Sequence, residues 1–436
     1  MAAGAGAALS ISVHGCARAA VGRATRATAI TQVFGDGIRL TAVTVEYDQP
    51  IQGDTLSADS FEVEGRTVTG VFTSASSSPA DRATRGRFVV VTLSPSDASA
   101  SLAERASPPG ANGRPPNGRA GPGKAGTPST ADTVYRVAAA KVAQAKPVLR
   151  VDGATIAASG EPRTTTSTSN LIVDEFRQLE YKDASTGKLL RYNLFVPRRY
   201  DPSKAYPLVL FMHDAGATSE VTRTTLLQGL GAIIWASAED QGKHPCFVVA
   251  PQYAEIIADD DSQTSDMMDI TIRLVTALAA QYSIDKTRLY ATGQSGGCMM
   301  AIAMNIKYPA LFAASLLVAG QWDPALTRPL ANKRLWIVVS QDDDKAYTGE
   351  NAIISVLEAE GAKISRATWD GTWTAEQFQS AFEKIDAETN PINYVTFSKG
   401  SVIPRGESAA GASGHRNTWR IAYTIAPVRD WIFRQR

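Results

Sequence analysis

The segment LYATGQSGGCMM (residues 289–300) places Ser295 between glycines, directly after one apolar run and directly before another. A serine at a tight strand-to-helix turn holds its hydroxyl clear of the backbone, as the nucleophile motif G-x-S-x-G requires. Gly293 and Gly297 are the glycines of this motif. The same residue types are also common in ordinary turns, so these five residues alone leave a purely structural turn open.

A nucleophilic serine needs a base, and the base needs a carboxylate that orients it. The chain has four histidines, and only His415 follows Ser295, in the order that α/β-hydrolases use. We expect His415 in a loop of small residues, AAGASGHRNTW, just before a terminal helical segment. The carboxylate is expected where the strand in RLWIVVSQDDDKAY ends, and spacing alone does not choose among Asp342, Asp343 and Asp344.

The negatively charged oxygen of an acyl-transfer intermediate requires backbone donors. One candidate is the N–H of Gly296, which follows the serine, and the other is the N–H of Ala215 in LFMHDAGA. His213 precedes the serine and is interpreted as shaping this loop. Gln294, Trp322 and Trp369 are candidates for a substrate pocket, with core packing as the alternative for the tryptophans.

The elements that would position these residues fall in the segment 171–436. A hairpin is expected to turn near Thr186-Gly187, and continuous apolar runs typical of buried parallel strands begin near residues 207, 246, 288, 313 and 334. Helical patterns lie between them, including one with Met267, Ile270, Leu274 and Leu278 on one face. Strands that alternate with helices indicate an α/β fold with a doubly wound, mostly parallel sheet.

The N-terminal part follows a different pattern. Residues 1–28 are interpreted as a disordered or processed leader, and residues 29–162 contain several short strands that indicate a small all-β sandwich. A Pro/Gly-rich insertion at 107–128 interrupts it and is expected to be a mobile loop. A Thr/Ser-rich linker is expected at 163–170.

The composition and the N-terminal segment indicate which kinds of partner and which cellular location to expect. Lys plus Arg number 44 and Asp plus Glu number 43, so nothing indicates a nucleic-acid partner. No stretch approaches the length of a membrane span. The leader, although atypical of a signal peptide, leads us to expect a secreted or envelope-associated protein, with a cytoplasmic one as the alternative. Cys16, Cys246 and Cys298 are far apart, which indicates neither a disulfide framework nor a metal site.

Several motifs carry a family resemblance: YNLFVPRRYDPSKAYPLVLFMHDAGA, LYATGQSGGCMMA, VVSQDDDKAY and GHRNTWRIAYTIAPVRDWIF. The chain resembles α/β-hydrolase esterases that carry an N-terminal immunoglobulin-like domain, which are related to polyhydroxybutyrate depolymerases and feruloyl esterases. This resemblance covers essentially all of 171–436. It implies that Ser295, Asp343 and His415 form the catalytic triad, and it is the resemblance that selects Asp343 over its neighbours.

The resemblance implies a serine esterase without a cofactor, acting on a small-molecule or polymer ester. Short-chain, phenolic (feruloyl-like) and polyester substrates all fit this expectation. A serine peptidase of the same fold and a non-catalytic binding protein are the alternative hypotheses. Pairing of copies into a homo-oligomer through edge strands of the β domain is a further hypothesis.

Overall fold

The computed structural model describes residues 23–105, 123–128, 133–409 and 412–436. The predicted leader therefore lies outside the described residues up to position 22, as do Cys16 and most of the predicted insertion at 107–128. Contacts between residues divide the chain into two compact units. The first unit contains residues 42–93 and 140–167 with the N-terminal residues up to 28, and the second contains 29–41, 94–139 and 168–436.

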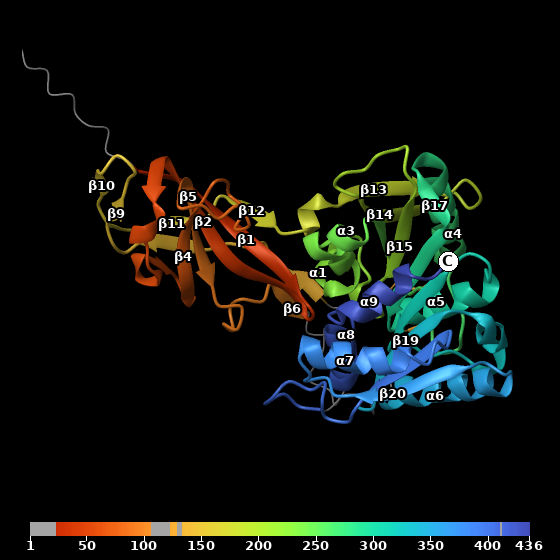
Figure 1. Ribbon diagram of the computed structural model, residues 1–436. Helices are drawn as coiled ribbons and strands as arrows, with labels where there is room; N and C mark the ends of the chain where they lie inside the picture. Colours follow the sequence, from red (N-terminus) through yellow and green to blue (C-terminus); the bar gives the residue numbers. More distant parts are fainter. Residues whose placement is uncertain (1–22, 106–122, 129–132, 410–411) are drawn as a thin grey trace, which may run out of the picture. The chain divides into compact units, whose positions relative to one another are not determined.

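Strands make up most of the regular structure in the N-terminal part of the chain, and β2 with 16 residues is the longest of them (Figure 1). One sheet has the order β12-β1-β2-β5-β4, and a second has the order β11-β8-β3. Within these sheets β2 pairs with β5, β4 with β5, β3 with β8 and β8 with β11, all antiparallel. The predicted all-β organisation is confirmed, but residues 163–170, where a linker is expected, include the end of β11 and all of β12.

The bounds of these strands are β1 (Ala24–Phe34), β2 (Gly37–Gln52), β3 (Phe61–Val63), β4 (Val68–Ser74), β5 (Arg85–Leu93), β6 (Ala103–Arg105), β7 (Thr133–Tyr135), β8 (Lys141–Gln144), β9 (Val148–Leu149), β10 (Thr155–Ile156), β11 (Ser159–Thr164) and β12 (Ser167–Asn170). Two further pairs, β6 with β7 and β9 with β10, are antiparallel.

The second unit is built on a nine-stranded sheet with the order β13-β14-β16-β15-β17-β18-β19-β21-β20. Its strands are β13 (Arg177–Lys182), β14 (Leu189–Phe195), β15 (Tyr206–Met212), β16 (Phe247–Gln252), β17 (Ile284–Gln294), β18 (Ala314–Val318), β19 (Leu335–Ser340), β20 (Ile364–Trp369) and β21 (Ile392–Phe397). The pairs β13–β14 and β14–β16 are antiparallel, and the remaining pairs are parallel. The predicted hairpin and mostly parallel sheet are therefore confirmed.

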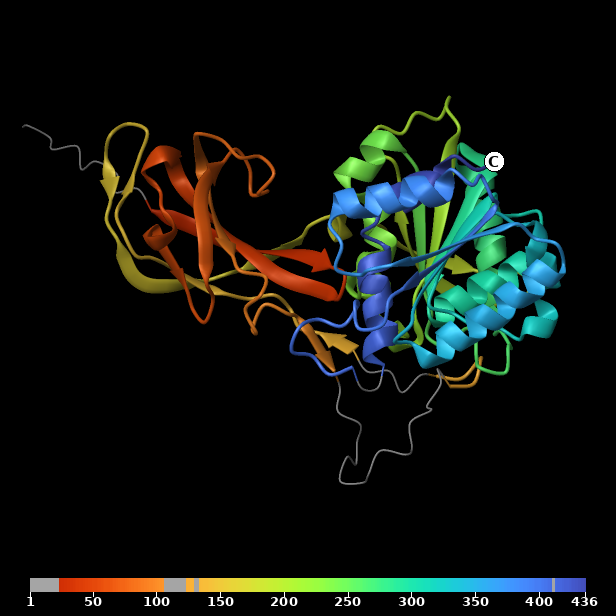
Figure 2. The ribbon, with the colours of Figure 1, turned by 60° about the horizontal axis from the view of Figure 1, so that its bottom comes forward.

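Helices cover both faces of this sheet, as Figure 2 shows. The helices are α1 (Thr224–Leu227), α2 (Leu230–Ile233), α3 (Ala238–Lys243), α4 (Met267–Gln281), α5 (Gly296–Lys307), α6 (Asp344–Ala359), α7 (Ala375–Asp386), α8 (Ser413–Ala422) and α9 (Ala426–Phe433). Residues of α4, α5 and α6 share one hydrophobic cluster with the sheet. On the other face Trp336 of β19 contacts Phe382 of α7 and Trp431 of α9.

The local sequence explains the two central helices. The four residues that we place on one face of α4 are all buried, because apolar residues at helical spacing face the sheet. Helix α5 is buried almost all round and ends just before Pro309. Cys246 and Cys298 are buried free thiols, as expected of small core residues. Within the described part of the chain, no helix is both long and apolar enough to cross a membrane.

Candidate active site

Ser295 lies at the turn between β17, which ends at Gln294, and α5, which begins at Gly296. Its φ of 53° lies in the left-handed region that non-glycine residues rarely adopt. The flanking glycines make this turn sterically possible. A Cβ atom on Gly293 would lie 2.4 Å from the Gly297 carbonyl oxygen, and a Cβ atom on Gly297 would lie 2.0 Å from the Met212 carbonyl oxygen.

His415 lies beside this serine, although the two residues are 120 positions apart in the chain. Its Nε2 atom is 2.8 Å from Ser295 Oγ. The expectation that His415 lies in a loop is wrong, because the residue belongs to the first turn of α8. Packing explains the glycine directly before it: a Cβ atom on Gly414 would lie 2.4 Å from the Asp342 carbonyl oxygen.

The second ring nitrogen of His415, Nδ1, is hydrogen-bonded to Asp343 Oδ2. Asp343 follows β19, is 6% exposed, and also caps α6 by accepting a hydrogen bond from the Ala346 N–H. Its two neighbours point elsewhere: Asp342 Oδ2 accepts from the Gly400 N–H, and Asp344 is exposed. The structure therefore brings Asp343 and His415 together with Ser295 in one hydrogen-bonded chain.

The two backbone groups that we expect to bind an oxyanion also lie together. A Cβ atom added to Gly296 would lie 3.7 Å from the nitrogen of Ala215. Ala215 begins a short 3-10 helix that Asp214 caps, with Asp214 Oδ1 accepting from the Gly216 N–H at 2.8 Å. The other oxygen of Asp214 accepts from Gln294 Nε2 at 3.0 Å, which links this loop to the neighbour of the serine.

His213 is buried and supports the same loop. Its Nδ1 bonds to the carbonyl oxygen of Asp214 at 2.7 Å, and its Nε2 accepts from the Tyr253 N–H at 3.0 Å. Burial lowers the pKa of His213, so its neutral form is favoured. These contacts agree with the interpretation of His213 as a residue that shapes the loop.

Sequence reasoning missed a buried acid on α6, the helix that Asp343 caps. Glu350 of α6 is 2% exposed, and its Oε1 accepts from the Gly320 N–H at 3.1 Å. Burial, with a smaller contribution from the charge of Asp343, raises the pKa of Glu350 well above its usual range. The sequence carries no local signal for it, because helical periodicity does not separate a buried acid from an exposed one.

Trp419 is a second residue that sequence reasoning missed. It lies one helical turn after His415, and its ring meets the imidazole edge-to-face with the ring centroids 4.9 Å apart. The spacing i, i+4 on one helix could have indicated this contact. Trp419 packs against the imidazole and limits its rotation.

The three pocket candidates are all largely buried. Gln294 is 1% exposed and bonds to Asp214 and Gln228, and Trp322 is 7% exposed. Trp369, at 2% exposed, packs in an aromatic cluster with Trp336, Trp373 and Phe378. For Trp369 this is the core packing that the sequence left as the alternative.

The arrangement as a whole is suited to moving one proton. An imidazole with a hydroxyl on one nitrogen and a buried carboxylate on the other can accept the hydroxyl proton while the carboxylate stabilises the resulting cation. Backbone nitrogens near the hydroxyl can bind a negative oxygen. In the described part of the chain, no cluster of three or more His, Cys, Asp or Glu side chains could hold a metal ion.

Comparisons with known proteins agree with this architecture. Residues 26–157 match the family described as esterase Ig-like N-terminal domain, and residues 190–323 match the family described as esterase PHB depolymerase. Ser295 falls within the second match, whereas Asp343 and His415 follow it. No curated protein matches the chain.

Solved structures resemble the chain to different extents. The crystal structure of a thermostable esterase is 25% identical, covers 94% of this chain and 99% of its own, and superposes with a TM-score of 0.74. A mutant of the feruloyl esterase module from Clostridium thermocellum, complexed with sinapinate, is 13% identical and covers 58% of this chain and 86% of its own, with a TM-score of 0.39.

Proposed function

We propose that this protein, which is a carboxylic-ester hydrolase of the α/β-hydrolase fold with an immunoglobulin-like N-terminal domain, acts through a triad of Ser295, His415 and Asp343. The observation that carries this proposal is the hydrogen-bonded chain from Ser295 Oγ through the His415 ring to Asp343. The left-handed backbone of Ser295, which costs energy, supports a functional role for this turn.

In the proposed reaction, His415 Nε2 takes the proton of Ser295 Oγ as the oxygen attacks the ester carbonyl carbon. Asp343 holds the imidazole tautomer and stabilises its cation. The N–H groups of Ala215 and Gly296 bind the oxyanion. His415 then protonates the leaving alcohol, and the acyl group stays on Ser295. Water, activated by His415, releases the acid and restores the serine.

The test is the initial rate on p-nitrophenyl esters for wild type and Ser295→Ala. Removing the nucleophile of a triad costs about 10⁴-fold or more in kcat, so we expect the variant to be inactive within error while its unfolding temperature stays close to that of wild type. Ser355→Ala, which changes an exposed helical serine, is the matched control and keeps full activity. Near-wild-type turnover by Ser295→Ala would contradict the mechanism.

The natural ester is proposed as short-chain, phenolic or polymeric. A series of p-nitrophenyl esters with increasing acyl length measures the size of the acyl site, and p-nitroanilide analogues measure amide cleavage. Esters carry the better leaving group, so we expect ester turnover to exceed amide turnover. An enzyme that cleaves the anilides faster is a peptidase rather than an esterase.

A further inference from the structure

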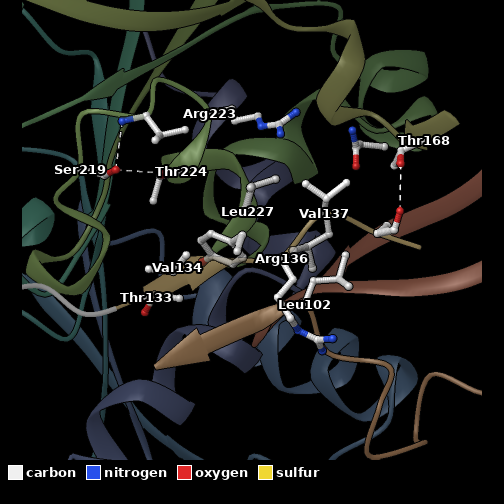
Figure 3. Close-up of a pocket in the computed structure, with 15 residues that line it drawn as sticks. Leu102, Thr133, Val134, Arg136, Val137, Thr168, Ser219, Arg223, Thr224 and Leu227 are labelled. Carbon is white, nitrogen blue, oxygen red and sulfur yellow. Dashed lines mark hydrogen bonds between the residues drawn. The ribbon is translucent and has the colours of Figure 1, made fainter. Parts of the chain in front are cut away.

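A pocket of about 210 Å³ lies in the unit that contains the triad. Figure 3 shows its walls. Leu102, Val134 and Val137 come from the segment before residue 139, and Val221 and Leu227 come from the segment that follows the proposed oxyanion loop. The pocket is thus built by two parts of the chain that are distant in sequence.

Three valines of this pocket are accessible, although Leu102 and Leu227 are buried. Val134 is 60% exposed, Val137 is 81% exposed and Val221 is 56% exposed. The described part of the chain has six exposed large apolar side chains, and three of the six line this pocket. Accessible apolar side chains that gather at one place mark a binding surface rather than random exposure.

The pocket wall is connected to the proposed nucleophile. Gln294, the neighbour of Ser295, donates to Asp214 at 3.0 Å and to Gln228 at 3.2 Å. These two residues are the ends of the segment 214–228, whose middle lines the pocket. A group bound in the pocket therefore contacts the segment that also carries the Ala215 amide.

The size and charge of the pocket define its ligand. A cavity of about 150 Å³ binds benzene in another protein, so this pocket accommodates a single ring or an alkyl chain of similar size. Arg223 lies at its wall, is exposed, and forms no ion pair within the described residues. Arg136, the other arginine of the wall, is already paired with Glu104. Arg223 is thus the cation that is available to a ligand.

We propose that this pocket binds the chain of an ester substrate that ends in a carboxylate, with its methylene groups against Val134, Val137 and Val221 and the carboxylate beside Arg223. The proposal rests on the proposed esterase function. The preferred substrates are half-esters of short diacids or acylated hydroxyacids.

The test compares kcat/KM for matched esters with purified full-length protein. Ethyl hexanoate carries a neutral six-carbon chain on the acyl side of the ester, and monoethyl adipate is its partner with a terminal carboxylate. Hexyl acetate carries the neutral six-carbon chain on the alcohol side, and 6-acetoxyhexanoate is its partner with a terminal carboxylate. Ethyl acetate is too short to fill the pocket. The variants are Val137→Asn and Arg223→Gln, and Val151→Asn is the control because Val151 is an exposed valine outside the pocket.

We expect Val137→Asn to lower kcat/KM on the six-carbon chain about tenfold relative to ethyl acetate. Wild type should prefer the carboxylate ester over its neutral partner by up to about fivefold, the range of an exposed ion pair, and Arg223→Gln should remove this preference. Unchanged ratios in either variant overturn the proposal. Ethyl acetate hydrolysis that survives Ser295→Ala would instead contradict the proposed function, so the two failures are distinguishable.

Discussion

Glu350 is a buried acid that has no step in the proposed reaction but supports the backbone near the site. Within the described residues its Oε2 atom has no hydrogen-bond partner, and the hydroxyl of Tyr394 has none either. Its Oε1 holds the Gly320 N–H. A Cβ atom on Gly320 would lie 2.4 Å from Cys298 Sγ, so Glu350 fixes a backbone that packs directly against α5.

Replacing this acid should change the pH dependence of stability. Burial raises the pKa of Glu350, so the native state holds its proton at pH values where the unfolded state, with a pKa of about 4.3, has lost it. The contribution of the neutral carboxyl to stability is present below about pH 4 and is lost as the pH rises. Glu350→Gln should therefore match wild type in the free energy of unfolding at pH 4 and exceed it at pH 8.

Urea unfolding at both pH values measures this difference. Glu358→Gln is the control, because Glu358 lies on the same helix with its side chain exposed and paired with Arg366. A gain for Glu350→Gln that is equal at pH 4 and pH 8 would show that titration of this carboxyl is not the cause.

How far single residues could be predicted depends on what specifies them. Ser295 follows from local steric requirements that the flanking glycines reveal, and His415 follows from the small number of histidines and their order. Asp343 does not follow from spacing, since the direction of a side chain in a loop is set by tertiary contacts. In the structure only Asp343 of the three candidates contacts the imidazole, and the sequence alone could not separate it from Asp342.

At the scale of elements, apolar runs locate the buried centre of the sheet better than its edge. The strands β15 to β19 coincide with the runs that we identify, whereas β20 and β21 lie outside them. β20 is an edge strand and contains Arg366. β21 is buried yet contains Asn393 and Thr396. Polar residues within a buried strand break an apolar pattern, so such strands are not visible to it.

Helices α3 and α9 are joined by one buried ion pair. Arg429 Nε and Nη2 contact the two carboxylate oxygens of Asp240 at 2.6 and 2.8 Å, and both side chains are less than 10% exposed. Arg429 Nη1 also donates to the carbonyl oxygen of Tyr423 at 2.7 Å. The pair fixes α9 against an element 189 positions earlier in the chain.

Removing one partner of the Asp240–Arg429 ion pair should lower the free energy of unfolding more than replacing both partners. Arg429→Met leaves Asp240 buried without its cation, which typically costs about 3–5 kcal/mol, whereas replacing both charges by apolar side chains is often neutral. We therefore expect the double variant Asp240→Leu, Arg429→Met to be more stable than Arg429→Met alone. A double-mutant cycle from guanidinium unfolding measures the difference, and strictly additive losses would contradict it.

At the scale of the whole molecule, sequence order and compact units do not coincide. Residues 29–41 and 94–139 precede the matched esterase region, yet they belong to the unit that contains it. The Leu171 N–H donates to the carbonyl oxygen of Thr31 at 3.0 Å, and the Ile256 N–H donates to that of Thr127 at 2.9 Å. The catalytic unit is therefore completed by the N-terminal segments, which a boundary drawn from composition cannot reveal.

This arrangement makes one glycine in the N-terminal segments important for the catalytic unit. A Cβ atom on Gly35 would lie 2.4 Å from the carbonyl oxygen of Arg420, which belongs to α8, the helix that carries His415. Gly35→Ala must displace one of these backbones, so we expect a loss of about 1–3 kcal/mol in unfolding free energy and a lower kcat on p-nitrophenyl acetate.

Gly160→Ala is the matched control, since nothing lies within 4 Å of its added Cβ. If Gly35→Ala behaved like Gly160→Ala in both measurements, the packing of residues 29–41 against α8 would not constrain the position of His415. A shift in kcat together with stability would instead show that this histidine is held partly from outside the esterase region of the sequence.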